Sequence, residues 1–166
     1  MEIKINYATL ETLIKFYNEN KYSFNPPLDL QVNSIEEYVA KLKNKAIIFE
    51  AWGGELMGLV AVYMNNCETK IAFISSVLVS AEYQRKGIAE MLLKSVIEAA
   101  ISKEFVKIEL EVYKTNIKAI NLYKKFGFEE IFREGLLTNE HNGVGITFMK
   151  MDIEGAEHTP CAQRHN

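Results

Sequence analysis

The sequence is poor in cysteine, arginine and long hydrophobic runs, and each shortage argues against a class of protein. Two of its 166 residues are cysteine, so we expect reduced cytosolic thiols and no disulfide framework. The arginines are Arg85, Arg133 and Arg164, and the net charge is −3. Phosphate contacts need a basic excess, so no nucleic-acid partner is expected. The longest apolar stretches are far shorter than a bilayer span, so no membrane partner is expected either.

The remaining composition is that of an ordinary globular domain. Hydrophobic residues make up 48% and charged residues 25% of the chain, and the first residues lack a signal-peptide pattern, which predicts a cytoplasmic protein. We expect one domain over residues 1–153 and a flexible tail over residues 154–166, where apolar periodicity ends. The tail contains His158, Cys161 and His165. Metal binding there is the alternative to a frayed end, and we expect no metal.

The hydrophobic pattern predicts a mixed α+β domain. Period-two segments indicate strands over residues 2–7, 46–52, 55–64, 70–79, 106–113, 128–133 and 145–153. Helical spacing indicates helices from about residue 10 to 22, 34 to 45, 87 to 103 and 116 to 126. Turn residues at Gly53-Gly54 and Asn65-Asn66 join the second, third and fourth strands into an antiparallel meander.

The most informative stretch is the strand-to-helix turn over residues 77–89. An apolar strand ends, a short turn follows, and a helix begins at Gly87. The first turn of a helix presents unpaired N–H groups and the positive end of the helix dipole. Gly87 lets a ligand approach the backbone, and Ala89 keeps the second turn small. The geometry suits a pyrophosphate, and the alternative is an ordinary turn without a ligand.

Two motifs in this chain resemble the GNAT superfamily of acetyl-CoA-dependent N-acetyltransferases. Residues 84–89, Gln-Arg-Lys-Gly-Ile-Ala, resemble the family signature Gln/Arg-x-x-Gly-x-Gly/Ala. Residues 116–128 match the family pattern Asn-x-x-Ala-x-x-Leu-Tyr-x-x-x-Gly-Phe. The nearest motif likeness is to the branch that acetylates ribosomal-protein N-termini. The resemblance implies a mostly antiparallel, twisted sheet of about seven strands with helices on both faces, and it covers residues 1 to about 153.

The resemblance also implies how acetyl-CoA binds. Backbone amides in the first motif would hold the pyrophosphate, and the pantetheine arm would lie along the strand before it, where this strand and the next splay apart. The Val77 amide would face the thioester oxygen, Asn116 would touch the cofactor arm, and Tyr123 would lie by the sulfur. The full set of cofactor-binding residues implied is Val77, Leu78, Val79, Gln84, Arg85, Lys86, Gly87, Ile88, Ala89, Asn116 and Tyr123.

The implied reaction needs a base and an acid. An alkyl ammonium with a pKa of about 10.4 is almost entirely protonated at pH 7, so a base, a water chain or a desolvating pocket must release the nucleophile. Glu109 and Glu111 share one face of a predicted strand. The Glu111-Val112 dipeptide matches the base position of the ribosomal branch, whereas the histone-acetylating branch would place its Glu at Phe73. Glu111 is therefore the candidate base, directly or through a water, and Tyr123 is the candidate acid.

The acceptor is the least constrained part. We expect it to be bound by the loop after the first helix, with Tyr22, Phe24 and Asp29, and by the hairpin over residues 136–143, with Glu140. The motifs favour a protein or peptide amino group. An antibiotic, amino sugar or amino acid is the alternative acceptor, and a non-catalytic acyl-CoA sensor is the alternative function. Dimers are frequent in the family, so a homodimer is a candidate assembly.

Overall fold

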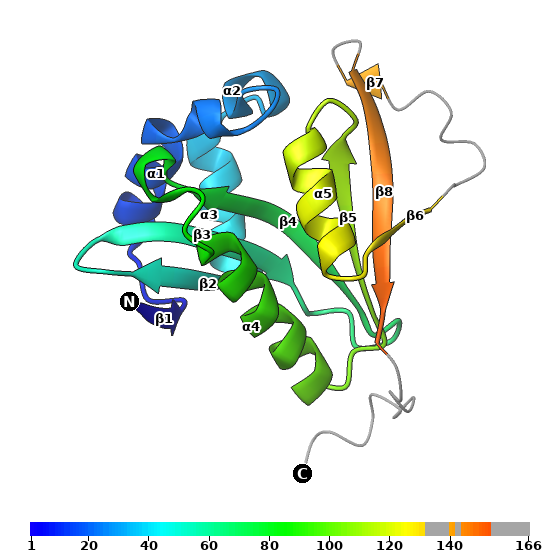
Figure 1. Cartoon of the computed structure of the whole chain (residues 1–166). Coiled ribbons are helices and arrows are strands. Elements are labelled where there is room, and N and C mark those ends of the chain that lie inside the picture. The colour runs from blue at the N-terminus through cyan, green and yellow to red at the C-terminus, as the bar shows by residue number, and fades with distance from the viewer. Residues whose placement is uncertain (132–139, 142–143, 154–166) are drawn as a thin grey trace.

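The strands build one mixed sheet, and helices lie on both of its faces (Figure 1). The computed structural model describes residues 1–131, 140–141 and 144–153. Their strands are β1 (Glu2–Ile5), β2 (Ile47–Trp52), β3 (Leu56–Tyr63), β4 (Ile71–Val79), β5 (Lys107–Tyr113), β6 (Glu129–Ile131), β7 (Glu140–His141) and β8 (Val144–Asp152). Their helices are α1 (Leu10–Glu19), η1 (Lys21–Ser23), α2 (Leu28–Gln31), α3 (Ile35–Lys45), η2 (Ala81–Tyr83), α4 (Ile88–Ser102) and α5 (Ile117–Lys125).

The sheet has the order β1-β2-β3-β4-β5-β8-β6, and β7 pairs with β8 at its end. All described strand pairs are antiparallel except β4–β5, which is parallel. A parallel pair needs a long crossover connection, and α4 supplies it. The antiparallel meander β2-β3-β4 and the mostly antiparallel sheet expected from the sequence are confirmed.

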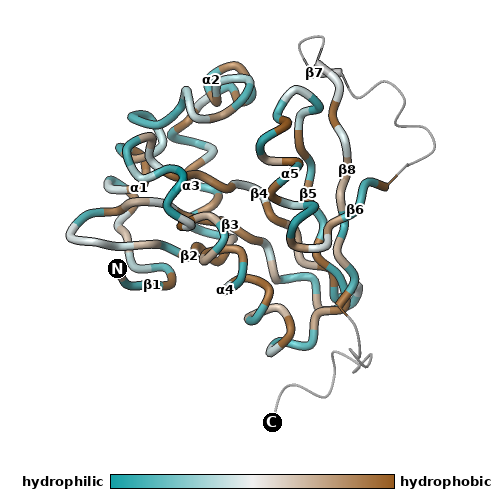
Figure 2. Tube along the Cα trace, viewed as in Figure 1, coloured by the Kyte–Doolittle hydropathy of each residue, from teal (hydrophilic) through white to brown (hydrophobic). Residues whose placement is uncertain are grey.

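Helices cover both faces of the sheet, and each face has its own apolar core. On the α1/α3 face, Leu13, Tyr17, Val39 and Leu42 pack against β2, β3 and β4. The α4/α5 face packs a separate cluster from α4, α5 and the strands under them, including Leu92, Val96, Ile108, Leu110 and Tyr123. Figure 2 shows hydrophobic stretches in α4 and in the strands beneath it. The sheet therefore separates two apolar cores.

Side chains cap the starts of α1 and α3, and α1 ends earlier than its predicted range. The Thr12 amide donates to Thr9 Oγ1 at 3.1 Å at the start of α1, and the Glu37 amide donates to Ser34 Oγ at 3.2 Å at the start of α3. α1 ends at Glu19, and the chain continues as the single turn η1 rather than as helix to residue 22. α2 was not predicted, because four residues are too few to show helical periodicity.

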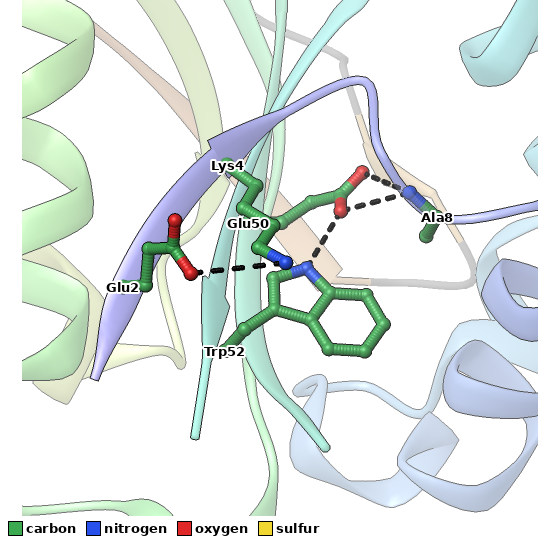
Figure 3. A network of polar contacts seen from close by, with 5 residues as sticks. All are labelled: Glu2, Lys4, Ala8, Glu50 and Trp52. Carbon is green, nitrogen blue, oxygen red and sulfur yellow. Dashed lines mark hydrogen bonds and ion pairs between the residues drawn. The ribbon is translucent and has the colours of Figure 1, made fainter. Parts of the chain in front are cut away.

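A buried carboxylate ties the first strand to the rest of the sheet (Figure 3). Glu50 on β2 is 0% exposed. Its oxygens accept from the Tyr7 amide at 3.1 Å, the Ala8 amide at 2.9 Å and the Trp52 indole at 2.8 Å. A buried charged group needs such donors, because desolvation without them is costly. Glu50 thereby fixes the turn that leads from β1 into α1.

Cys67 is disulfide-bonded rather than free, which corrects the expectation of reduced thiols. Within the described part of the chain, no helix has the length and apolar character needed to cross a bilayer. The tail over residues 154–166, with the metal alternative at His158, Cys161 and His165, also lies outside the described residues.

Candidate active site

The strands β4 and β5 diverge about halfway along their length. Their parallel register runs from Ile71 opposite Lys107 to Ile74 opposite Leu110 and then stops. β4 continues to Val79 and β5 continues to Tyr113, so the remaining residues of the two strands face a gap. The divergence of these strands that the family resemblance implies is therefore present.

A β-bulge in β4 marks the point of divergence. Val62 on β3 lies opposite Ile74, and Ala61 lies opposite Ser76, so Ser75 is the extra residue. A bulge bends its strand and shifts the alternation of side chains. Before the bulge, Ile74 packs into the α4/α5 core; after it, Val77 does. Ser75 and Ser76 both face α1 and α3, where they meet the hydroxyls of Tyr38 and Tyr17.

The bulged strand turns two peptide groups into the gap. The Ser80 amide donates to the Met57 carbonyl at 2.9 Å across the β3–β4 ladder. Hydrogen-bonded pairs recur at every second residue of an antiparallel ladder, so Leu78 faces β3 while Val77 and Val79 face away from it. The Val79 carbonyl is already used there, because the Gln84 side chain donates to it at 3.1 Å. The Val77 peptide group lies where an extended ligand could add to the strand.

The turn before α4 has the backbone of an anion cradle. Arg85 has a φ of 63° and Gly87 a φ of 78°, and alternation of left- and right-handed residues points successive N–H groups into one concavity. No side chain caps the start of α4, so its first amides stay available. A Cβ at Gly87 would meet nothing within 4 Å. Glycine is therefore favoured there by its φ, not by crowding.

A cavity of about 670 Å³ joins this turn to the gap between β4 and β5. Twelve of the predicted site residues line it: Phe24, Val77, Leu78, Val79, Gln84, Arg85, Gly87, Ile88, Ala89, Glu111, Asn116 and Tyr123. The cradle of amides, the free strand edge and the cavity between them fit a pyrophosphate with an extended arm. No cation-binding group of three or more His, Cys, Asp or Glu side chains occurs among the residues described.

Three predicted site residues do not line the cavity. Tyr22 is 73% exposed, and Asp29 forms an ion pair with Lys21 at 3.2 Å. The Lys86 ammonium lies 5.5 Å from the centre of the Tyr83 ring. The side chain of Glu140 lies outside the described residues. The structure thus brings Phe24 of the predicted acceptor loop to the cavity and leaves Tyr22 and Asp29 away from it.

Tyr123 combines a buried ring with a place in the cavity wall. The side chain is 7% exposed, and its ring lies 5.8 Å from that of Phe128. Burial raises the pKa of Tyr123 well above its usual value, since desolvation disfavours the phenolate. The hydroxyl therefore stays protonated and remains a hydrogen-bond donor at physiological pH.

Asn116 and Glu111 occupy the cavity wall in different ways. Asn116 also begins α5, because its Oδ1 accepts from the Ala119 amide at 3.3 Å. Glu111 is exposed and lies in the cavity wall. Its neighbour Tyr113 has a raised pKa, caused first by burial and then by the negative charge of Glu111.

Glu111 and Tyr123 lie on opposite faces of the sheet. Ile108, Leu110 and Val112 of β5 pack into the α4/α5 core, so the alternate residues Glu111 and Tyr113 point to the α1/α3 face. Tyr123 belongs to the α4/α5 core. The cavity passes between them through the gap, so one titratable group flanks it on each face.

Several cavity residues were not predicted from the sequence. They are mainly apolar, aromatic or hydroxyl side chains: Leu28, Val32, Tyr38, Phe73, Ser75, Tyr113 and Ile146. The signal for Tyr113 was present, because it shares the period-two face of Glu111. The place of Ile146 follows from its pairing opposite Tyr113, and such cross-strand neighbours have no local signature.

Known proteins resemble this chain throughout. The sequence model of the acetyltransferase (GNAT) family matches residues 10–128. The chain is 32% identical over 136 residues to the uncharacterized N-acetyltransferase YsnE of Bacillus subtilis (strain 168), covering 78% of this chain and 86% of that one. The crystal structure of ribosomal-protein-S18-alanine N-acetyltransferase from Escherichia coli has a TM-score of 0.73 at 20% identity, with 95% and 98% covered. A Bacillus subtilis acetyltransferase in complex with CoA has a TM-score of 0.67 at 19% identity, with 92% and 98% covered.

Proposed function

This chain belongs to the acetyltransferase (GNAT) family and is an acetyl-CoA-dependent N-acetyltransferase, and we propose that it moves the acetyl group to a primary amine by direct attack in a ternary complex. The observation that carries the proposal is the gap between β4 and β5, because one cavity there reaches both the α4 turn and the α1/α3 face. Acetyl-CoA and the amine can therefore bind at the same time, one from each face of the sheet, and meet in the gap.

Acetyl-CoA supplies an acetyl group activated as a thioester, and this chain has groups suited to hold its parts. The amides of residues 84–89 receive the pyrophosphate, with the dipole of the fifteen-residue helix α4 behind them. The Val77 amide and carbonyl and the Val79 amide, which face the gap, align the pantetheine arm as an added strand. Asn116, already in the cavity wall, contacts the arm from the α5 side.

The Val77 amide is the donor for the thioester oxygen. It lies past the bulge, on the stretch of β4 that no longer pairs with β5. A backbone N–H held in a sheet needs no reorganisation when negative charge develops on that oxygen, and such preorganised donors are among the strongest contributions to catalysis.

The two faces of the sheet divide the proton transfers between them. On the α1/α3 face, Glu111 takes a proton from the acceptor ammonium, directly or through a water. The freed amine attacks the acetyl carbonyl through the gap. On the α4/α5 face, the Tyr123 hydroxyl, which its raised pKa keeps protonated beforehand, gives its proton to the thiolate as the C–S bond breaks. The second proton of the attacking nitrogen leaves as the amide forms and restores the Tyr123 hydroxyl.

The position of Cys67 does not support a covalent acetyl-cysteine intermediate. Cys67 does not line the cavity and is disulfide-bonded. We therefore expect intersecting lines in a double-reciprocal plot with both substrates varied. Parallel lines would indicate a ping-pong reaction and contradict direct transfer.

For the acceptor we favour a protein or peptide amino group. The support is the Glu111-Val112 dipeptide with Tyr123, together with the shared fold of the Escherichia coli enzyme that acts on ribosomal protein S18. A small amine such as an antibiotic, amino sugar or amino acid is the second candidate. Incubation with acetyl-CoA and a cell extract, followed by mass spectrometry of peptides and small molecules, separates the two. Cofactor binding without thiol release across all amines would instead indicate a sensor.

Replacement of Gly87 tests the cofactor site. Gly87→Glu places a carboxylate in the anion cradle, and we expect the affinity for CoA in isothermal titration calorimetry to fall by at least about a hundredfold. Gly87→Gln is the matched control, because it imposes the same strain at a φ of 78° without the charge. A smaller loss in the glutamine variant supports the cradle. Unchanged affinity in Gly87→Glu would place the pyrophosphate elsewhere.

A further inference from the structure

We propose that Tyr17 is a positioning residue for acetyl transfer, because its hydroxyl anchors Ser76 and thereby fixes the direction of the Val77 amide. This inference rests on the proposed function, in which the Val77 amide is the donor for the thioester oxygen. Tyr17 lies on α1 and is not among the described residues that line the cavity. It therefore acts on the reaction through Ser76, which does line the cavity.

Strand pairing supports β4 weakly where the Val77 amide lies. On the side of β5, the pairing ends at Ile74 opposite Leu110. On the side of β3, the bulge at Ser75 interrupts the ladder one residue before Ser76. A bulge leaves its extra residue unpaired and bends the strand. Pairing therefore fixes the residues after the bulge less firmly than the stretch before it, which is paired with both neighbouring strands.

The Val77 N–H belongs to the peptide group that begins at Ser76. Because a peptide group is planar, the orientation of Ser76 fixes the direction in which this N–H points. The backbone of Ser76 pairs with Ala61 on β3, and its hydroxyl accepts from the Tyr17 hydroxyl at 3.0 Å. Ser76 is thus held by its backbone on the β3 side and by its side chain on the α1/α3 face. A rotation that turned the Val77 N–H away from the gap would disturb both contacts.

The hydrogen bond between Tyr17 and Ser76 is buried, and its donor is held in place. Tyr17 is 0% exposed and Ser76 is 4% exposed, so breaking this bond would leave buried hydroxyls without a partner. The Tyr17 ring stacks on Phe24 with the ring centres 6.2 Å apart and meets the Tyr38 ring edge-on at 6.0 Å. Burial raises the pKa of Tyr17 well above its usual value, so its hydroxyl remains a donor at physiological pH.

A second tyrosine, Tyr38 on α3, contacts the bulge residue itself. The Tyr38 hydroxyl donates to the Ser75 carbonyl at 3.4 Å and lies 3.3 Å from Ser75 Oγ. The helices α1 and α3 therefore each place one tyrosine hydroxyl on the bulged part of β4. Tyr38 lines the cavity, so a change there would also alter the cavity wall. Tyr17 therefore gives the more specific test of positioning.

Tyr17→Phe keeps the stacked ring and removes the hydroxyl that anchors Ser76. The probe is acetyl-CoA labelled with ¹³C at the thioester carbonyl, whose infrared band is compared in the free and the bound state. A donor at the carbonyl oxygen polarises this bond and lowers its stretching frequency. We expect the variant to lose at least about half of the frequency shift found in the wild type, while the Kd for acetyl-CoA in calorimetry stays within about twofold. A merely structural role would not separate these two measurements.

Tyr63→Phe is the matched control. Tyr63 on β3 packs against the same apolar core as Tyr17 and is not among the described residues that line the cavity. Its replacement also removes a tyrosine hydroxyl, and it should leave the frequency shift and the Kd as in the wild type. Ser76→Ala removes the anchoring hydrogen bond from its other end and takes the place of Tyr17→Phe if that variant does not fold. The double variant should lose no more of the shift than either single variant, because both act through one bond.

Calorimetry with acetyl-CoA distinguishes failure of this inference from failure of the proposed function. Absence of binding to the wild type would overturn the proposed function. Binding without a frequency shift would show that no donor meets the thioester oxygen, and it would overturn the role of Tyr17. An unchanged shift in Tyr17→Phe, an equal loss in Tyr63→Phe, a parallel loss of affinity or additive losses in the double variant would each overturn that role and leave the acetyltransferase intact.

Discussion

Glu50 and Glu111 are two carboxylates on the same sheet with opposite surroundings. Glu50 lies on β2 between two paired strands, where it is 0% exposed and accepts from two backbone amides and an indole. Glu111 lies on β5 just beyond the last residue that pairs with β4, and it is exposed to the cavity. The comparison teaches that pairing with strands on both sides makes a carboxylate part of the scaffold, whereas the end of one strand pairing places a carboxylate in the wall of a cavity.

The largest expected effect is the loss of stability on replacing Glu50, the carboxylate between paired strands. In Glu50→Gln one acceptor oxygen becomes a donor that faces N–H groups, so buried donors lose their partner. We expect the free energy of unfolding to fall by about 2–4 kcal/mol, which for a chain of this size lowers Tm by about 6–12 °C. Denaturant unfolding and a thermal melt measure the change. KM for acetyl-CoA in the protein that remains folded should equal the wild-type value. A higher KM with unchanged stability would instead give Glu50 a role in the site.

Tyr123→Phe tests the α4/α5 side of the gap. Removal of the hydroxyl while the ring stays packed on Phe128 should lower kcat by about a hundredfold and leave KM for acetyl-CoA within about twofold. Because burial raises the pKa of Tyr123, the wild-type kcat should not fall through loss of this proton below about pH 10. Thiol release, followed by stopped-flow or steady-state kinetics over a range of pH, measures the kcat and KM of the variant and the pH dependence of the wild type. Equal losses in kcat and in cofactor affinity would indicate a packing role alone.

The sequence predicted the elements that carry local signals. Gly87 was placed at the start of α4, Ser34 at the start of α3, and the end of α5 just before Gly127, which has a positive φ. Each of these helix ends depends on a backbone conformation that a few adjacent residues determine. The divergence of β4 and β5 was expected only from the family resemblance, because the sequence around Ser75 contains no signal that predicts a bulge.

The residues that line the cavity on the α1/α3 side were harder to predict, because contacts across the sheet have no local signature. Phe24 was expected there, but Tyr22 and Asp29 were equally plausible by position and do not reach the cavity. The side chain of Asp29 pairs with Lys21 instead. Tyr38 comes from α3 and Ile146 from β8, and only the folded sheet brings them to the same wall.

The smallest expected effect is on Glu111, and it sharpens the comparison with Glu50. In Glu111→Gln we expect kcat/KM for the amine to fall by about tenfold at pH 7 and Tm to stay unchanged, since the side chain is exposed. The loss should shrink as the pH approaches 10, because the amine then deprotonates in solution. Glu109→Gln is the matched control: Glu109 lies two residues earlier on the same face, opposite Phe73 in the paired part of β4, and does not line the cavity. A tenfold loss in both variants, or a loss in Glu111→Gln that is constant from pH 7 to 10, would mean that the carboxylate steers the ammonium by charge and that a water chain removes the proton.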